Sequence, residues 1–396
     1  MARKKSELKG TQNNDSGILR IFEEIAKETN VAEANLMDDI FDTPLTVFNE
    51  LIGGIPKGRI VSIASEPGAG KTTLMVQVIA HLQQHEECNI IYIDTEQSMS
   101  RRRFSELGLD IDKILYIQPQ TLEDAYTFII KSLQRKQELG DMSPLLIAFD
   151  SITATPTKKD IQSDETDFQQ QVGHRARINS KAIPIIQTYA SKTNTTFLMI
   201  NQLRKNINIG YGSFFTPQDE IVGGLSLLYY AAVDIRLSSS LSSKNKLLES
   251  NEIDGKLVWA KTKKNRLMTP MIEFPMILDY KNGFDNDLSN LAFLLEFDEY
   301  SKDYLQVGSW YKVKNILTGK EYSFRLSDYK QMCVDDPEFR QTIDDLVVYI
   351  CRKEFKGLKD EVILDELTNR KLKDTRDSNI VRETGTTNSE DWWTNR

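Results

Sequence analysis

Four short runs of almost wholly apolar residues recur along the chain, and longer stretches of mixed polarity separate them. The runs are 59–64, 89–94, 145–150 and 196–201. Such runs are typical of parallel strands that are buried on both faces. Two of the intervening stretches, 73–84 and 122–136, carry apolar residues at helical spacing. This alternation predicts an α/β core with a mainly parallel central sheet over residues 45–285.

The residues before this core form a separate N-terminal segment, 1–44. Its beginning is polar and is predicted to be disordered. Further on, Ile18, Phe22 and Ile25 recur at helical spacing, which predicts a short amphipathic helix between residues 17 and 30. Such a helix either folds back on its own core or docks on a neighbouring subunit, and the sequence leaves both readings open.

After the core the alternation ends. Residues 286–365 mix short apolar runs with Trp310 and a helical stretch near 339–352, which predicts a small α+β C-terminal domain. Residues 366–396 are polar and are predicted to form a disordered tail. The pair Trp392–Trp393 in this tail either anchors a partner protein or folds back on the preceding domain.

Composition and charge exclude several classes of protein. The 396 residues include 50 Lys and Arg against 58 Asp and Glu, so the net charge of −8 excludes a uniformly basic nucleic-acid binder. Three cysteines and three histidines, with no CxxC pair, exclude a disulfide framework and a zinc site. No apolar run approaches the about 18 residues of a membrane span, and the basic start lacks the apolar stretch of a signal peptide. We therefore expect a cytoplasmic protein without a membrane partner.

A candidate phosphate-binding loop follows the first apolar run. It matches the pattern G-x-x-x-x-G-K-[ST] except that a serine replaces the first glycine. Gly68 and Gly70 allow backbone N–H groups to turn toward a phosphate. Lys71 is expected to reach the β- and γ-phosphates of a nucleotide, and Thr72 is expected to bind Mg²⁺. The loop consists of Ser65, Glu66, Pro67, Gly68, Ala69, Gly70, Lys71, Thr72 and Thr73.

Two carboxylates end neighbouring strands of the predicted sheet. Asp150 closes the run 145–150 and is expected to hold Mg²⁺. Glu96 follows the run 89–94 and is expected to orient or deprotonate an attacking water. The carboxyl ends of parallel strands meet at one edge of a sheet, which brings both groups near the loop. The competing readings are a turn-capping Asp150 and a surface Glu96.

The order of these motifs resembles the core of the RecA family of recombinases. The matching segments are 52–60, 92–96, 149–151, 199–204 and 222–224, and they span most of the predicted core. The C-terminal part, with AspProGluPheArg at 336–340, is similar to that of the phage UvsX-type recombinases. The resemblance implies an ATP- and Mg²⁺-dependent enzyme that forms homo-oligomeric filaments on single-stranded DNA. It further implies that the enzyme catalyses strand exchange with homologous duplex DNA. A single-strand-binding protein and a mediator are the implied protein partners, and the implied location is the host cytoplasm if a phage encodes the chain.

The resemblance also assigns roles to single residues at the nucleotide. It implies that Glu96 is the catalytic carboxylate and that Gln202 senses the γ-phosphate. It implies that Lys264 and Arg266 reach the nucleotide of the neighbouring subunit; the competing reading is a solvated basic strand edge. Where the family usually places an aromatic ring on the adenine, this chain offers either the Arg103 guanidinium or the ring of Phe104.

Two segments correspond to the DNA-binding loops of the family. The first, about 157–173, has an unexpectedly acidic body and is followed by Arg175 and Arg177, of which Arg177 matches the family's arginine best. The second runs from about 203 to 224 and combines cations, glycines and aromatic rings, a composition suited to DNA. Its candidate DNA-binding residues are Arg204, Lys205, Phe214, Phe215, Gly223 and Gly224.

Two other classes of protein share such a core. A hexameric helicase would translocate along DNA, but no large N-terminal domain precedes this core. A mediator that binds DNA without hydrolysing ATP would have a degenerate site, whereas Lys71, Thr72, Asp150 and Glu96 are all present. The sequence therefore favours a recombinase.

Overall fold

The computed structural model describes residues 39–162, 168–205, 219–221, 224–239 and 245–370. The helix predicted between residues 17 and 30 and the pair Trp392–Trp393 lie outside these ranges. Within the described part of the chain, no helix is both long and apolar enough to cross a membrane.

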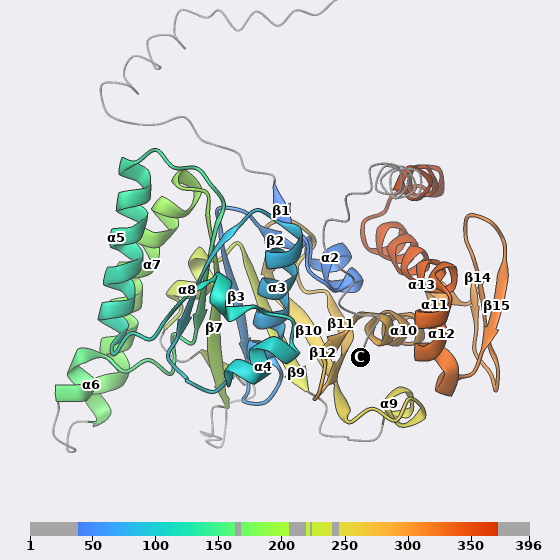
Figure 1. The fold of residues 1–396 in the computed structure, drawn as a ribbon, viewed down its shortest axis with the longest axis horizontal. Helices are drawn as coiled ribbons and strands as arrows, with labels where there is room; N and C mark the ends of the chain where they lie inside the picture. Colours follow the sequence, from blue (N-terminus) through green and yellow to red (C-terminus); the bar gives the residue numbers. More distant parts are fainter. Residues whose placement is uncertain (1–38, 163–167, 206–218, 222–223, 240–244, 371–396) are drawn as a thin grey trace, which may run out of the picture. The chain divides into compact units, whose positions relative to one another are not determined.

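A large mixed β-sheet forms the centre of the molecule (Figure 1). Its strands follow the order β12-β11-β10-β9-β3-β7-β6-β4-β5. Within the described residues, the parallel strands are β3 (Ile60–Ser65), β4 (Asn89–Asp94), β5 (Leu115–Ile117), β6 (Leu145–Asp150), β7 (Thr195–Lys205) and β9 (Val233–Ser239). Antiparallel strands extend one side: β10 (Gly255–Asn265), β11 (Glu273–Asp279) and β12 (Gly283–Asp285). The predicted α/β fold with a mainly parallel sheet is confirmed.

Helices cover both faces of this sheet. Successive residues of a strand point to opposite faces, so neighbouring residues of one strand contact different helices. Tyr92 of β4 packs in the apolar cluster that includes α3 (Lys71–His85). Its neighbour Ile93 packs in the opposite cluster, beneath α5 (Leu122–Glu138) and α7 (Phe168–Lys192). Helices α5 and α7 lie side by side in Figure 1. Burial of both faces explains why the strand sequences are apolar runs without polar alternation.

The carboxyl ends of the parallel strands share one edge of the sheet. Asp94 at the end of β4 is paired in register with Asp150 of β6, and Ser65 of β3 with Gln202 of β7. Helix α3 begins at the same edge, six residues after Ser65. The motifs predicted from distant parts of the sequence therefore meet here, and we call this side the loop edge.

Strand β10 runs against its neighbour β9. Val258 pairs with Ser239 at the end of β9, and Asn265 pairs with Val233 at its start. Because β9 is parallel to β3, the first residues of β10 lie at the loop edge and the last ones at the opposite edge.

The chain after the sheet forms an α+β region. β12 ends at Asp285. The Asp285 side chain caps the N-terminus of the next helix, α10, by accepting a hydrogen bond from the Leu288 N–H. The helices and strands are α10 (Asn286–Glu296), α11 (Asp298–Ser301), β13 (Leu305–Gln306), β14 (Tyr311–Lys314), β15 (Glu321–Phe324), α12 (Tyr329–Asp335) and α13 (Pro337–Ile350), with a π-helical turn at Cys351–Phe355. Residues 360–370 are also helical, so regular structure continues past the predicted boundary at residue 365.

Shorter elements connect these parts. A buried ionic contact joins α2 (Thr46–Ile52) to the C-terminal region: the Glu50 carboxylate accepts hydrogen bonds from Arg352 at 2.8 Å and Lys356 at 2.7 Å. The remaining elements are β1 (Ile40–Phe41), α2 (Thr46–Ile52), β2 (Ile55–Pro56), α4 (Arg101–Glu106), η1 (Ile111–Lys113), α6 (Lys158–Gln162), β8 (Asp219–Ile221), α8 (Ser226–Tyr230), α9 (Lys246–Ser250) and η2 (Leu326–Asp328).

Candidate functional site

The phosphate-loop candidate is a tight turn between β3 and α3. Gly70 has a φ of +89°, and a Cβ added there would lie 2.9 Å from the Leu278 side chain, so backbone conformation and space both require glycine. Within the described structure no side chain caps α3, whose first N–H groups face the turn. Ser65, which replaces the first glycine of the motif, lies in β3 in an extended conformation that serine adopts without strain. The loop is therefore suited to bind an anion.

The Lys71 ammonium lies against this loop. It is only 8% exposed and donates hydrogen bonds to the Ser65 hydroxyl at 3.0 Å and the Glu66 carbonyl at 3.2 Å. Burial lowers the pKa of Lys71, although the charges of Glu96 and Asp150 act in the opposite direction. A cation partly stripped of water has a strong affinity for phosphate oxygens.

Asp150 is buried next to the loop. One carboxylate oxygen, Oδ2, accepts hydrogen bonds from the Thr72 hydroxyl at 2.8 Å and from the Tyr92 hydroxyl at 3.1 Å. The other, Oδ1, is buried without a hydrogen-bond partner among the described residues. Burial raises the pKa of Asp150 to about 7, despite the two donated hydrogen bonds. An unpartnered carboxylate oxygen beside a threonine hydroxyl fits the oxygen ligands that Mg²⁺ requires.

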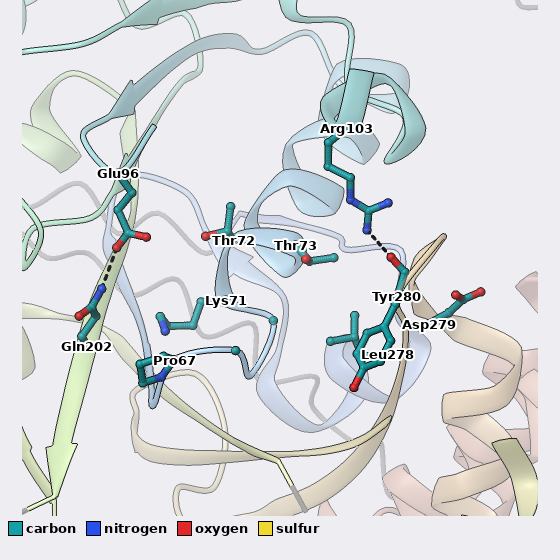
Figure 2. Close-up of a pocket in the computed structure, with 12 residues that line it drawn as sticks. Pro67, Lys71, Thr72, Thr73, Glu96, Arg103, Gln202, Leu278, Asp279 and Tyr280 are labelled. Carbon is teal, nitrogen blue, oxygen red and sulfur yellow. Dashed lines mark hydrogen bonds between the residues drawn. The ribbon is translucent and has the colours of Figure 1, made fainter. Parts of the chain in front are cut away.

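Glu96 and Gln202 meet across the sheet edge. The Gln202 Nε2 donates a hydrogen bond of 2.9 Å to Glu96 Oε1 (Figure 2), and the Ser151 hydroxyl donates to the same oxygen at 2.6 Å. Asp94 fixes the turn that carries Glu96, because its Oδ1 accepts the Glu96 N–H at 3.0 Å. Glu96 is therefore no isolated surface carboxylate in this structure: it is half-buried and accepts hydrogen bonds from Gln202 of β7 and from Ser151, which follows β6.

Lys71, Thr72, Glu96 and Gln202 line a pocket of about 330 Å³, and Asp150 lies next to it through its bond to Thr72. Arg103 lines it and donates a hydrogen bond of 3.0 Å to the Tyr280 carbonyl (Figure 2). It also donates to the Lys281 carbonyl. Phe104, the alternative to Arg103, is 1% exposed and packs edge-on against the Tyr92 ring in the core. The structure thus places Arg103, and not Phe104, in the pocket wall. The half-exposed Tyr280 ring also lines the pocket, and the sequence analysis did not find it.

Other residues of the predicted loop occupy different positions. Pro67, Gly68, Gly70, Thr72 and Thr73 line the pocket. Ala69 is buried in the hydrophobic core. Glu66 is exposed at the surface of the loop.

The predicted DNA-binding residues are only partly within the described structure. Arg204 and Lys205 are the last residues of β7, where Lys205 pairs with Asp219 of β8. Gly224 has a φ of +88° and lies close to α7, since a Cβ there would be 3.0 Å from the Ala176 Cβ. Phe214, Phe215 and Gly223 lie outside the described residues.

The two arginines of α7 differ in their surroundings. Arg177 is exposed. The Arg175 guanidinium instead donates to the Thr153 carbonyl and forms an ion pair with Asp160 at 3.5 Å. Arg177 is therefore the better placed of the two to meet a phosphate.

Lys264 and Arg266 lie far from the pocket of their own chain. Lys264 pairs with Asp234 near the start of β9, at the edge opposite the loop edge. Its ammonium donates to the carbonyls of Leu228 at 3.1 Å and Tyr229 at 2.6 Å, at the end of α8. Arg266 is exposed. Neither residue can serve the nucleotide site of its own chain, and a role at another subunit's site stays a prediction.

The strand–loop–helix turn, the acidic strand end and the pocket at the carboxyl edge of a parallel sheet define a P-loop α/β protein. The RecA N-terminal domain family matches residues 41–285. Proteins named Protein RecA are similar: that of Bacteroides thetaiotaomicron is 29% identical over 75% of this chain and 82% of its own. The protein of Leptospira meyeri is 31% identical over 75% of this chain and 70% of its own length. The protein of Mesomycoplasma hyopneumoniae is 32% identical over 68% of this chain and 74% of its own length. The chain belongs to the RecA family.

Proposed function

We propose that this chain is an ATP-dependent DNA recombinase that forms filaments on single-stranded DNA and catalyses homologous pairing and strand exchange. Its family membership and the relatives named Protein RecA support this function. The observation that carries it is the hydrogen bond between Gln202 and Glu96. It links the carboxylate proposed to act on water to the strand that leads into the proposed DNA-binding segment.

Residues in and beside the pocket take separate tasks in ATP hydrolysis. The N–H groups at the start of α3 bind the phosphates, and Lys71 neutralises the charge that develops on them. Thr72 and Asp150 would hold Mg²⁺, which neutralises phosphate charge when bound. Glu96 orients the attacking water and accepts its proton. Ser151 holds the Glu96 carboxylate in place for this task.

Gln202 provides the coupling between nucleotide and DNA. Its side chain donates to Glu96, and its backbone N–H donates to the Thr153 hydroxyl at 3.1 Å. Arg204 and Lys205 follow on the same strand. A γ-phosphate competes with Glu96 for the Gln202 amide, so nucleotide state shifts the end of β7. DNA bound to the segment after β7 shifts the same element, which makes hydrolysis DNA-dependent.

The C-terminal region supports a more specific assignment. Its small α+β fold follows the sheet directly, and its resemblance to the phage UvsX-type recombinases extends the proposal to that group. We propose four parts of the chain: an N-terminal docking segment (1–44), the ATPase core (45–285), the C-terminal domain (286–365) and a tail (366–396). A single-strand-binding protein and a mediator are the proposed accessory partners, and the host cytoplasm the proposed location.

A strand-exchange assay tests this function. The full chain is mixed with ATP, Mg²⁺, single-stranded DNA and a homologous duplex, and Lys71→Ala serves as the site-dead control. Joint molecules formed by the parent and not by Lys71→Ala are the expected result. Directional unwinding of a forked duplex would instead identify a helicase. DNA binding with neither product, and equal behaviour of the two proteins, would identify a mediator.

A further inference from the structure

A second lysine lies at the phosphate loop. The Lys256 ammonium donates a hydrogen bond to the Gly68 carbonyl, at the outer turn of the loop. A Cβ added at Gly68 would lie 4.0 Å from this nitrogen. The ammonium also lies 5.9 Å from the centre of the Tyr280 ring, which lines the pocket.

The register of the sheet brings Lys256 to this position. Lys256 is the second residue of β10, whose start lies at the loop edge, and it pairs with Leu278 of β11. Paired residues of neighbouring strands share one face of the sheet. Leu278 and Tyr280 both line the pocket. Lys256 does not itself line the pocket, but it lies on the same sheet face as its pair Leu278, and its ammonium contacts the lining residue Gly68.

The charge of Lys256 is not balanced by the protein. Among the described residues no carboxylate forms an ion pair with it, and its polar contact is with a neutral carbonyl. Burial alone lowers the pKa of Lys256, with no carboxylate acting in the opposite direction. By comparison, Lys320, which also lies over a tyrosine ring, at 4.6 Å from the centre of Tyr322, bonds the Glu338 carboxylate at 2.6 Å.

We infer that Lys256 is a phosphate-recognition residue, which meets the nucleotide bound by its own chain and supplies a further cation in addition to Lys71. The inference rests on the proposed nucleotide site and adds a residue to it. The polyphosphate provides the counter-charge that Lys256 lacks. Because the attraction grows with ligand charge, Lys256 favours ATP over ADP and contributes little to binding of AMP.

Substitutions can separate the charge of Lys256 from its hydrogen bond to Gly68. Lys256→Arg keeps the charge and the donor, Lys256→Gln keeps a donor without the charge, and Lys256→Leu removes both. Lys320→Gln is the matched control, because Lys320 also lies over a tyrosine ring but contacts Tyr322 and Glu338, neither of which lines the pocket. Affinities for ATP, ADP and AMP are measured by calorimetry with Mg²⁺ and without DNA, and thermal unfolding verifies that each variant is folded.

If Lys256 recognises phosphate, Lys256→Gln and Lys256→Leu bind ATP about fivefold more weakly, lose less for ADP and nothing for AMP. Lys256→Arg and Lys320→Gln then bind as the parent does. If Lys256→Gln binds ATP as tightly as the parent, the inference is wrong, even if Lys256→Leu binds ATP more weakly. In that case the hydrogen bond to Gly68, and not the charge of Lys256, would support ATP binding. If the parent does not bind ATP, or if Lys71→Ala binds ATP as tightly as the parent, the proposed nucleotide site is wrong and the inference fails with it.

Discussion

The hydroxyl groups of Thr72 and Tyr92 donate to the same oxygen of Asp150. Burial raises the pKa of this carboxyl to about 7, and each donated hydrogen bond opposes that rise by stabilising the charged form. Tyr92 is fully buried in the middle of β4 and in sequence resembles any core aromatic residue. It nevertheless helps to keep the proposed magnesium ligand ionised.

Tyr92→Phe tests this role, since it keeps the ring and removes the donor. We expect the Mg²⁺ concentration for half-maximal ATP hydrolysis to rise about fivefold, with little change in the maximal rate. The loss of a donor raises the pKa of Asp150 further, so the difference from the parent widens as the pH falls through 7. ATPase titrations with Mg²⁺ at several pH values measure this.

Tyr126→Phe is the matched control for that substitution. Its hydroxyl donates to Asn179 at 2.8 Å on the opposite face of the sheet, away from Asp150. An equal shift in the two variants, or none in Tyr92→Phe, would show that the Tyr92 hydroxyl does not support the carboxylate.

At the residue scale, the sequence predicts side chains that a fixed spacing defines. Lys71 and Thr72 are identified by their positions in one loop, and Asp150 by its place at a strand end. Tyr92 and Lys256 are not predictable in this way, because pairing between distant strands brings them to the site. The choice between Arg103 and Phe104 likewise needs the packing of α4, which buries the phenylalanine.

At the element scale, β7 connects the pocket with the proposed DNA-binding segment. We expect Gln202→Ala to bind ATP normally and to lose the stimulation of hydrolysis by single-stranded DNA, because the amide that both ligands act on is gone. ATPase rates with and without DNA measure this. Gln331→Ala on α12 is the control, since its amide bonds only Asp335 among the described residues. Equal stimulation in Gln202→Ala and the parent would remove Gln202 from the coupling.

The contact of Glu50 with Arg352 and Lys356 gives a prediction about stability. Burial acts to raise the pKa of Glu50, but the two hydrogen-bonded cations outweigh it and hold the pKa below its ordinary value of 4.5. A depressed carboxyl pKa stabilises the fold above the unfolded-state pKa, and the stabilisation is lost as the pH falls through the folded-state value. Glu50 therefore stabilises the attachment of α2 at neutral pH.

Glu50→Gln should lower the free energy of unfolding by about 2–4 kcal/mol at pH 7, because it leaves two half-buried cations without their partner. The difference from the parent should shrink below pH 4.5, where the parent's own carboxyl becomes protonated. Urea unfolding across this range measures it, with the exposed Glu87→Gln as control. A constant difference at all pH values would exclude an ionic origin.

The elements themselves could be predicted to different degrees. β4 and β6 coincide with apolar runs of the sequence, because strands buried on two faces contain few polar residues. β10 carries four lysines in its Gly255–Asn265 span and lacks such a run. Its place in the sheet depends on antiparallel pairing with β9 and β11, which a local pattern does not encode.

At the scale of the whole molecule, β10 joins two edges of the sheet, with Lys264 at the edge opposite its own pocket. If Lys264 and Arg266 complete a neighbour's site, the double Lys264→Ala, Arg266→Ala variant is inactive alone, because no subunit supplies the cations. Mixed in equal amounts with inactive Lys71→Ala, it should regain about a quarter of the parent's ATPase rate. In a random head-to-tail assembly, that fraction of sites combines an intact loop with an intact neighbour.

The complementation needs two controls. Lys264 also bonds the carbonyls at the end of α8, so thermal unfolding must show that the double variant is folded. Light scattering or electron microscopy must show that the two variants assemble together. Absence of recovery in such samples would mean that the basic segment is a solvated edge.

The length of β10 also sets a distance between active sites. Lys264 follows Lys256 by eight positions, and a strand rises by about 3.3 Å per residue, so the Cα atoms of the two lysines are about 26 Å apart. If one end of this strand contacts the ATP of its own subunit and the other end contacts the ATP of the next subunit, the length of the strand fixes the distance between the two ATP sites. Consecutive ATP sites along the assembly would then be spaced by roughly this length. This spacing would be set by the hydrogen-bonded backbone of β10 and would not depend on the DNA sequence.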